Sequence, residues 1–120
     1  MDDLTEQIIG AAMEVSTILG PGFLEKVYER ALLRELNLRG LKTKAQVRYP
    51  VIYKGHSVGE YTADLLVEGQ ILIELKCTDH LIEEHLAQCL NYLKASKKEL
   101  CLLMNFQKPK LQWKRIILTT

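Results

Sequence analysis

The stretch ADLLVEGQILIELKC, residues 63–77, decides how this chain folds. It has the pattern of two apolar strands joined by a turn around Gly69. Three charged side chains interrupt the apolar runs: Asp64, Glu74 and Lys76. Acids and lysines are seldom buried without a partner. We therefore expect these three charges to act together on the hairpin.

The spacing of the charges follows the period of a strand. Because side chains alternate along a strand, Glu74 and Lys76 point to one side and Leu75 points to the other. In a hairpin whose turn is centred on Gly69, residues equally far from that glycine lie opposite each other. Asp64 and Glu74 are then cross-strand neighbours with Cβ atoms about 5 Å apart. A two-residue turn would shift this pairing by one residue, so the register is a prediction.

Two carboxylates at that distance repel each other, and like charges directly opposite destabilise a sheet. A divalent cation between Asp64 and Glu74 reverses the sign of that interaction. Magnesium suits the position, since it often binds one or two protein carboxylates together with water and substrate phosphate. Lys76, one pleat further along, could orient a water nucleophile or contact the charge that grows on a scissile phosphate. These groups are the working parts of metal-assisted phosphodiester hydrolysis.

A simpler interpretation of the same residues is a salt bridge at a sheet edge. Lys76 would then pair with Glu74 or Asp64, and no metal would be involved. A short D-x(9)-E-x-K pattern taken alone favours the salt bridge, because such patterns are common. The metal site is favoured here because the charges stand on two paired strands that are otherwise apolar.

The whole chain has the composition of an ordinary soluble globular protein, with 48% hydrophobic and 26% charged residues. Its 120 residues predict a single domain over 1–120. No segment reaches the length of an apolar membrane span, and the start, MDDLTEQ, lacks the basic region of a signal peptide. We therefore expect a cytoplasmic protein that does not enter a membrane.

The three cysteines are widely spaced and predict neither a zinc site nor a disulfide framework.

Hydrophobic periodicity predicts eight elements in the order α-α-β-β-β-α-β-β. Asp79 is the expected N-cap of the third helix, and Pro50 places the first strand at a sheet edge or at a bulge. Apolar faces on both helices and strands are covered only if helices pack on a mixed sheet, which is an α/β (α+β) fold. Apart from the two opening helices and the third helix, the predicted elements are strands at residues 43–53, 58–67, 70–77, 99–106 and 111–118.

Several motifs in this order resemble the PD-(D/E)XK nuclease superfamily, and specifically its small bacterial branch, the GxxExxY proteins. The motif that names the branch stands here as GFLEKVY, residues 22–28, and the superfamily pattern as Asp64 followed by Glu74, Leu75 and Lys76. Further family-like segments are YKGHSVGEYTADLLV, IELK, AQCLNYL and LLMNF. The likeness runs over residues 8–117. The proline of the family's "PD" pair is absent, because Ala63 precedes the aspartate.

The resemblance implies a restriction-endonuclease-like core with a site for Mg²⁺ or Mn²⁺. Asp64, Glu74 and the backbone carbonyl of Leu75 would bind the ion, and Lys76 takes the position of the catalytic lysine. Glu25 matches the acid that many members carry on the helix before the sheet, as a further ligand of the metal or of water. Taken without the family, Glu25 is equally well explained as an acid favoured by the helix dipole.

Three residues are expected to support this site. Tyr28 shares a helical face with Glu25, and its alternative role is a core aromatic whose hydroxyl is satisfied at the rim. Gln88 and Tyr92 stand four apart on the third helix, and the resemblance implies that their face looks toward the metal site. Without the family, this pair is an ordinary polar edge of an amphipathic helix.

The function expected from these residues is a divalent-metal-dependent nuclease that acts on DNA. The net charge of +1 neither demands nor excludes nucleic acid, so a local basic patch matters more than the total. The alternative is a non-catalytic nucleic-acid-binding or accessory module that keeps the nuclease fold. Hydrolysis of a small phosphorylated substrate is a third possibility. A homodimer would suit the cutting of both strands of a duplex.

Overall fold

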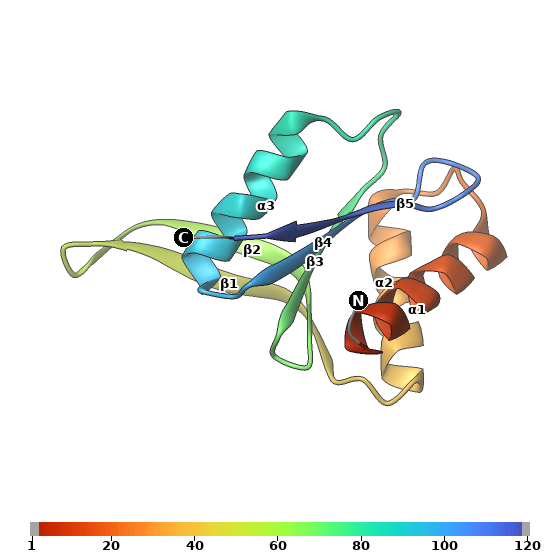
Figure 1. Ribbon diagram of the computed structural model, residues 1–120, viewed down its shortest axis with the longest axis horizontal. Helices are drawn as coiled ribbons and strands as arrows, with labels where there is room; N and C mark the ends of the chain where they lie inside the picture. Colours follow the sequence, from red (N-terminus) through yellow and green to blue (C-terminus); the bar gives the residue numbers. More distant parts are fainter. Residues whose placement is uncertain (1–2, 119–120) are drawn as a thin grey trace.

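The computed structural model describes residues 3–118, and its elements follow the predicted order (Figure 1). Within these residues, no helix combines the length and the apolar character needed to cross a membrane. The helices are α1 (Asp3–Leu19), α2 (Glu25–Leu38) and α3 (Glu83–Ser96). The strands are β1 (Thr43–Tyr53), β2 (His56–Val67), β3 (Ile71–Lys76), β4 (Leu100–Asn105) and β5 (Gln112–Ile117).

The five strands form one mixed sheet in the order β1-β2-β3-β4-β5. β1, β2 and β3 are an antiparallel meander, and β4 and β5 are also antiparallel. β3 and β4 run parallel because α3 carries the chain back between them. Pro50 lies in β1, an outer strand of the sheet, where its missing N–H costs no central ladder bond.

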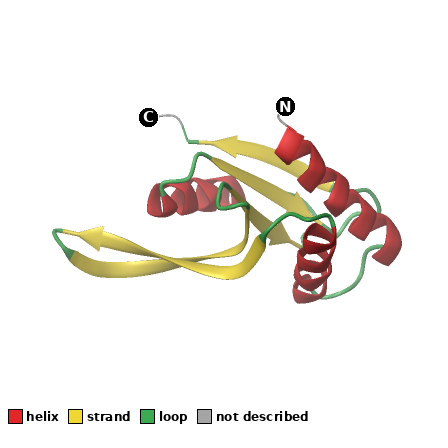
Figure 2. Ribbon diagram, turned by 90° about the horizontal axis from the view of Figure 1, so that it is seen from below, coloured by secondary structure: helices red, strands yellow, loops and turns green. Residues whose placement is uncertain are grey.

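Helices cover both faces of the sheet (Figure 2). α1 and α2 pack on one face, where their apolar residues join Leu65, Ile73 and Leu102 in the larger core. α3 packs on the other face with Leu72 and Leu103. All six residues of β4 are buried, which explains why this strand is a continuous apolar run and does not alternate. The predicted mixed sheet flanked by helices is thereby confirmed.

The predicted register of the β2–β3 hairpin is correct. Leu65 lies opposite Ile73, and Val67 lies opposite Ile71, so the turn is centred on Gly69. The backbone of Gly69 is left-handed, with φ of 65°, a conformation that glycine adopts without a Cβ penalty. The same register places Asp64 and Glu74 one step beyond the last backbone pair.

The expected cap of the third helix is wrong. α3 begins at Glu83 and not after Asp79, because the chain leaving β3 bends at residues 78–80 and is held there by the buried Asn105. The Asn105 side chain donates to the Thr78 carbonyl at 2.8 Å and accepts from the Thr78 N–H at 3.1 Å. These bonds keep the backbone of Thr78 out of a helix and fix the path of the chain just after Lys76.

Candidate active site

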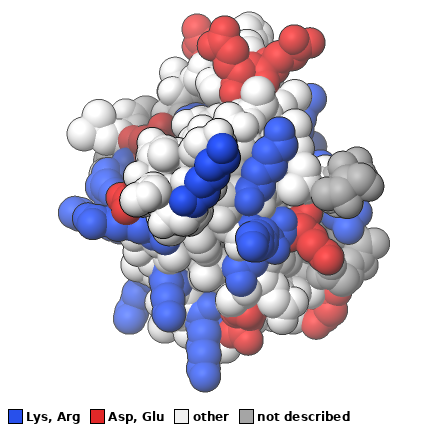
Figure 3. Space-filling view, turned by 90° about the vertical axis from the view of Figure 1, so that its left-hand side faces the viewer, with Lys and Arg blue, Asp and Glu red and all other residues white. Residues whose placement is uncertain are grey.

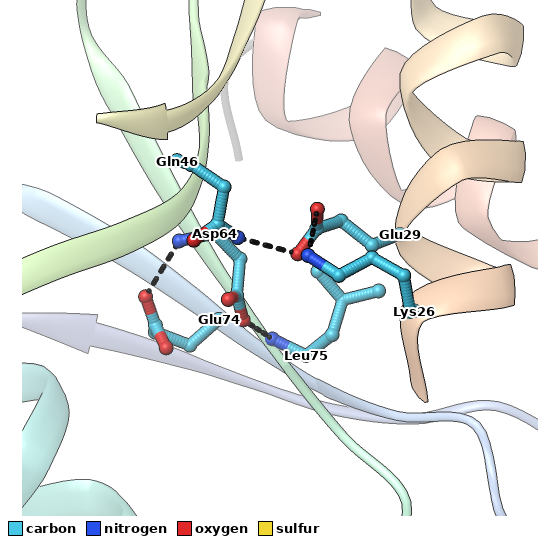
Figure 4. Close-up of polar contacts among 6 residues, drawn as sticks. All are labelled: Lys26, Glu29, Gln46, Asp64, Glu74 and Leu75. Carbon is cyan, nitrogen blue, oxygen red and sulfur yellow. Dashed lines mark hydrogen bonds and ion pairs between the residues drawn. The ribbon is translucent and has the colours of Figure 1, made fainter. Parts of the chain in front are cut away.

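Asp64 and Glu74 meet where the β2–β3 ladder ends (Figure 4). The Asp64 N–H donates to Oε1 of Glu74 at 3.1 Å. The Leu75 N–H donates to Oδ2 of Asp64 at 2.8 Å. Two carboxylates thus take the place of the backbone carbonyls that would continue a regular ladder. The hairpin stays closed at this step, and both acids are held at its centre.

Burial sets the electrostatics of the pair. Glu74 is only 2% exposed, and its burial together with the charge of Asp64 raises the pKa of Glu74 to about 9. Burial also raises the pKa of Asp64, although the hydrogen bond from Leu75 opposes the shift. Without a cation, Glu74 therefore carries a proton at neutral pH. A bound cation would favour the ionised form and release that proton.

Glu25 lies at the first turn of α2 and faces the carboxyl end of β3. Partial burial and the charge of Asp64 raise the pKa of Glu25, while Lys76 and the backbone N–H of Cys77 lower it. These interactions place Glu25, Asp64 and Lys76 in one electrostatic environment, although they come from three separate elements. The residues that the sequence singled out are therefore neighbours in the structure.

Between residues 3 and 118, no three His, Cys, Asp or Glu side chains stand in an arrangement that could hold a metal ion. Asp64 and Glu74 instead accept backbone N–H groups. Their chemistry nevertheless fits Mg²⁺ or Mn²⁺, because both ions prefer oxygen donors and a cation would offset the burial and the charge of Asp64 that keep Glu74 protonated. The carbonyl of Leu75 as a further ligand stays a prediction.

Tyr28 acts on the loop that precedes α2 and does not touch the two central acids. Its ring is fully buried and stacks on Phe106 at 5.0 Å between centroids. Its hydroxyl donates to the carbonyl of Gly20 at 2.5 Å and accepts from the N–H of Phe23 at 3.2 Å. Tyr28 therefore fixes where α2 begins and, through that, where Glu25 lies.

Gln88 and Tyr92 lie on the face of α3 that covers the sheet near Glu74. The Gln88 amide donates to the Tyr92 hydroxyl at 3.5 Å. The pKa of Tyr92 is raised by burial and by the charges of Glu74 and Asp64, so this hydroxyl is close to the acids. A contact of Gln88 with DNA or with Lys76 stays a prediction.

Glu29 belongs to the same region and was missed by the sequence reasoning. It is 6% exposed and lies on α2, one turn after Glu25. Its Oε1 accepts from the Gln46 amide at 2.8 Å, and its Oε2 accepts from Lys26 Nζ at 3.0 Å. The charge of Glu29 also contributes to the raised pKa of Asp64. The available signal was the four-residue spacing from Glu25, which puts both acids on one helical face.

A family model described as the PD-(D/E)XK nuclease superfamily matches residues 2–116, nearly the whole chain. No curated protein matches the sequence.

Solved structures share the fold at low sequence identity. The crystal structure of SSO0001 matches with a TM-score of 0.65 and 16% identity, over 80% of this chain and 51% of that one, so this chain spans about half its length. The alkaline exonuclease LHK-Exo from Laribacter hongkongensis matches with a TM-score of 0.59 and 15% identity, over 99% of this chain and 73% of that one. LHK-Exo in complex with dAMP gives a TM-score of 0.55 and 12% identity, over 96% and 83%. Together with the family model, these matches confirm the restriction-endonuclease-like core.

The raised pKa of Glu74 predicts how the stability of the metal-free protein depends on pH. Between the ordinary value of 4.5 and about 9, the folded state holds a proton on Glu74 that the unfolded chain has lost. The free energy of unfolding should therefore fall as pH rises through this window, by up to about 1.4 kcal/mol per pH unit for one proton. Urea unfolding in EDTA measures it. Glu74→Gln should flatten the curve, whereas Glu60→Gln, at an exposed acid of β2, should not; parallel curves for wild type and Glu74→Gln would contradict the assignment.

Proposed function

Because the chain belongs to the PD-(D/E)XK nuclease superfamily, we propose that it is a nuclease that hydrolyses DNA phosphodiester bonds with Mg²⁺ or Mn²⁺. The observation that carries this proposal is the pair of hydrogen-bonded acids at the end of a hairpin, Glu74 buried and Asp64 half-buried, with Lys76 two residues further along β3. Burial favours the protonated form of Glu74, and a cation between the two acids would allow both to ionise. We also propose that the chain belongs to the GxxExxY branch, on the strength of residues 22–28.

The roles of the residues follow from where they stand. Asp64 and Glu74 would hold the ion, with Glu25 as a further ligand of the ion or of its water. The bound ion would supply a charge that stabilises the transition state and a lowered pKa for its water. Lys76, half-buried at the end of β3, would contact the scissile phosphate or orient the attacking water. Gln88 and Tyr92 close the site from the side of α3.

A second candidate function is a nucleic-acid-binding or accessory module without catalysis. It is favoured by the same contacts that satisfy Asp64 and Glu74 with backbone N–H groups, and by the lack of a three-ligand cluster within residues 3–118. Such a module would keep the fold and bind DNA, but its acids would act only as structural groups.

A basic surface suits DNA in either case. Lys and Arg side chains gather on the end of the molecule that carries the tip of the β1–β2 hairpin (Figure 3). A hollow lies between this hairpin and the C-terminal part of α3, and Lys94 and Lys97 line it together with Ile52 and Tyr61. Lysines beside exposed apolar and aromatic groups suit the backbone and bases of nucleic acid. We also propose a homodimer, because two copies of the chain would supply one site for each strand of a duplex.

Removal of the charged groups should abolish cleavage and leave the fold intact. Asp64→Asn keeps an acceptor for the Leu75 N–H but removes a metal ligand, and Lys76→Ala removes the group at the phosphate. We expect nicking or degradation of DNA with Mg²⁺ or Mn²⁺ to fall at least ~100-fold in both variants. Asp79→Asn, at an exposed acid beyond β3, is the matched control and should retain full activity.

Calorimetric titration with Mn²⁺ separates the two candidate functions. The nuclease predicts binding by the wild type that is lost in Glu74→Gln. If the wild type cleaves neither DNA, RNA nor branched substrates and binds no Mn²⁺, the nuclease is refuted and the non-catalytic module is supported.

Neutralising the lysines at the hollow should weaken DNA binding in a salt-dependent way. Each phosphate contact that is lost lowers the slope of log K against log salt by about 1, so Lys94→Gln combined with Lys97→Gln should lower it by about 2. Fluorescence anisotropy with a labelled duplex in EDTA measures this without cleavage. Arg30→Gln combined with Arg34→Gln removes the same charge from exposed positions on α2 and should leave the slope nearly unchanged. Equal effects of the two pairs would show that only the total charge matters.

A further inference from the structure

Gln46 has an unusual backbone beside the site. It lies in β1 with φ of 54°, the left-handed region that residues with a Cβ seldom adopt. The residues on either side of it pair regularly, Ala45 with Leu65 and Val47 with Ala63. This register is the same before and after Gln46, so no residue is inserted, and Asp64 is the residue directly across. The strained residue therefore lies directly across from Asp64, the central acid of the site.

The strands change faces at this step. Leu65 packs in the core under α1 and α2, whereas Ala63 packs in the core under α3. Simple alternation would put these two residues on the same face of the sheet. Between them, Asp64 takes part in neither backbone ladder: it is missing from the pairs with β1 and from those with β3. Its N–H and its carboxylate are thereby left for Glu74 and Leu75.

One contact ties the side chain of Gln46 to the helix layer. Its amide donates to Oε1 of Glu29 at 2.8 Å, and the other oxygen of that acid is occupied by Lys26 (Figure 4). Glu29 is buried on α2, so its position is fixed by the packing of the helix. A buried carboxylate is retained at a cost in desolvation and therefore needs a use. Here the carboxylate binds Gln46, an exposed strand residue with a left-handed backbone.

We propose that Glu29 and Gln46 are a positioning pair. Their hydrogen bond holds the left-handed backbone of Gln46, and this conformation keeps Asp64 out of the ladder and directs its carboxylate toward the end of β3. The inference rests on the proposed function for its purpose, since the acid that it places is the expected metal ligand. Both residues would act through Asp64. A strained backbone beside a functional group is maintained only when the surrounding structure keeps it in place. In this proposal the hydrogen bond between Gln46 and Glu29 keeps it there.

Alanine and glycine at position 46 separate the amide contact from the backbone strain. Gln46→Ala removes the amide and keeps the Cβ, so the left-handed backbone is no longer held, whereas Gln46→Gly removes both the amide and the strain and should keep that backbone. Hydrogen exchange of the Leu75 amide, whose acceptor is Asp64, should become faster on the order of tenfold in Gln46→Ala and stay slow in Gln46→Gly, while exchange of the Leu72 amide in the same strand is unchanged in both. Lys44→Gly, at an exposed regular position of β1, is the matched control. It should lower the midpoint and leave Leu75 exchange as it is.

Variants of Glu29 complete the test. Glu29→Gln keeps an oxygen acceptor for the Gln46 amide and should preserve slow exchange at Leu75, whereas Glu29→Ala should reproduce the fast exchange of Gln46→Ala. Unchanged Leu75 exchange in both Gln46→Ala and Glu29→Ala would overturn the positioning pair, whatever the protein does with DNA. Mn²⁺ affinity is measured in the same variants. About a tenfold loss in Gln46→Ala supports the link to the site, and fast exchange in that variant with no metal binding even in the wild type would refute the proposed function alone.

Discussion

The structure depends on two hydrogen bonds at the end of the β2–β3 ladder, where side-chain carboxylates replace backbone carbonyls as the acceptors. There the Leu75 N–H binds the carboxylate of Asp64, and the Asp64 N–H binds the carboxylate of Glu74. These bonds let a hairpin with an apolar interior close around two acids without leaving backbone groups unsatisfied. They also hold Asp64 beside the buried Glu74, and the raised pKa of Glu74 is the reason to expect that a cation here would stabilise the ionised pair.

Other parts of the fold position the residues that surround these two hydrogen bonds. Tyr28 fixes the start of α2, and Asn105 fixes the chain just after Lys76, so a helix and a strand that are far apart in the sequence present their charges to the same place. α3 covers Glu74 through Tyr92, which in turn meets Tyr61 of β2 edge-to-face at 5.3 Å. The sheet thus supports the site from both faces, and the packing that stabilises the core also sets the burial of Glu74.

Sequence reasoning predicted the order of the elements, the mixed sheet flanked by helices and the hairpin register, because each depends on local periodicity and on a turn at a glycine. The neighbourhood of Asp64 and Glu74 followed from that register alone. It missed Glu29 and placed the cap of the third helix wrongly at Asp79. Both depend on contacts between distant residues, Gln46 with Glu29 and Asn105 with Thr78, which no local pattern records. The left-handed conformation of Gln46 has no sequence signal either, since glycine or asparagine would be expected there.

The central claim is that Asp64 and Glu74 form a metal site and are more than a buried structural pair. A crystal of the protein soaked in Mn²⁺, with diffraction measured at the manganese absorption edge, tests it most directly. The account predicts an anomalous peak within ligand distance of both carboxylates, with Lys76 beside it and Gln46 still bound to Glu29. An absent peak, with Asp64 and Glu74 still bound to their backbone N–H partners at saturating Mn²⁺, would contradict it.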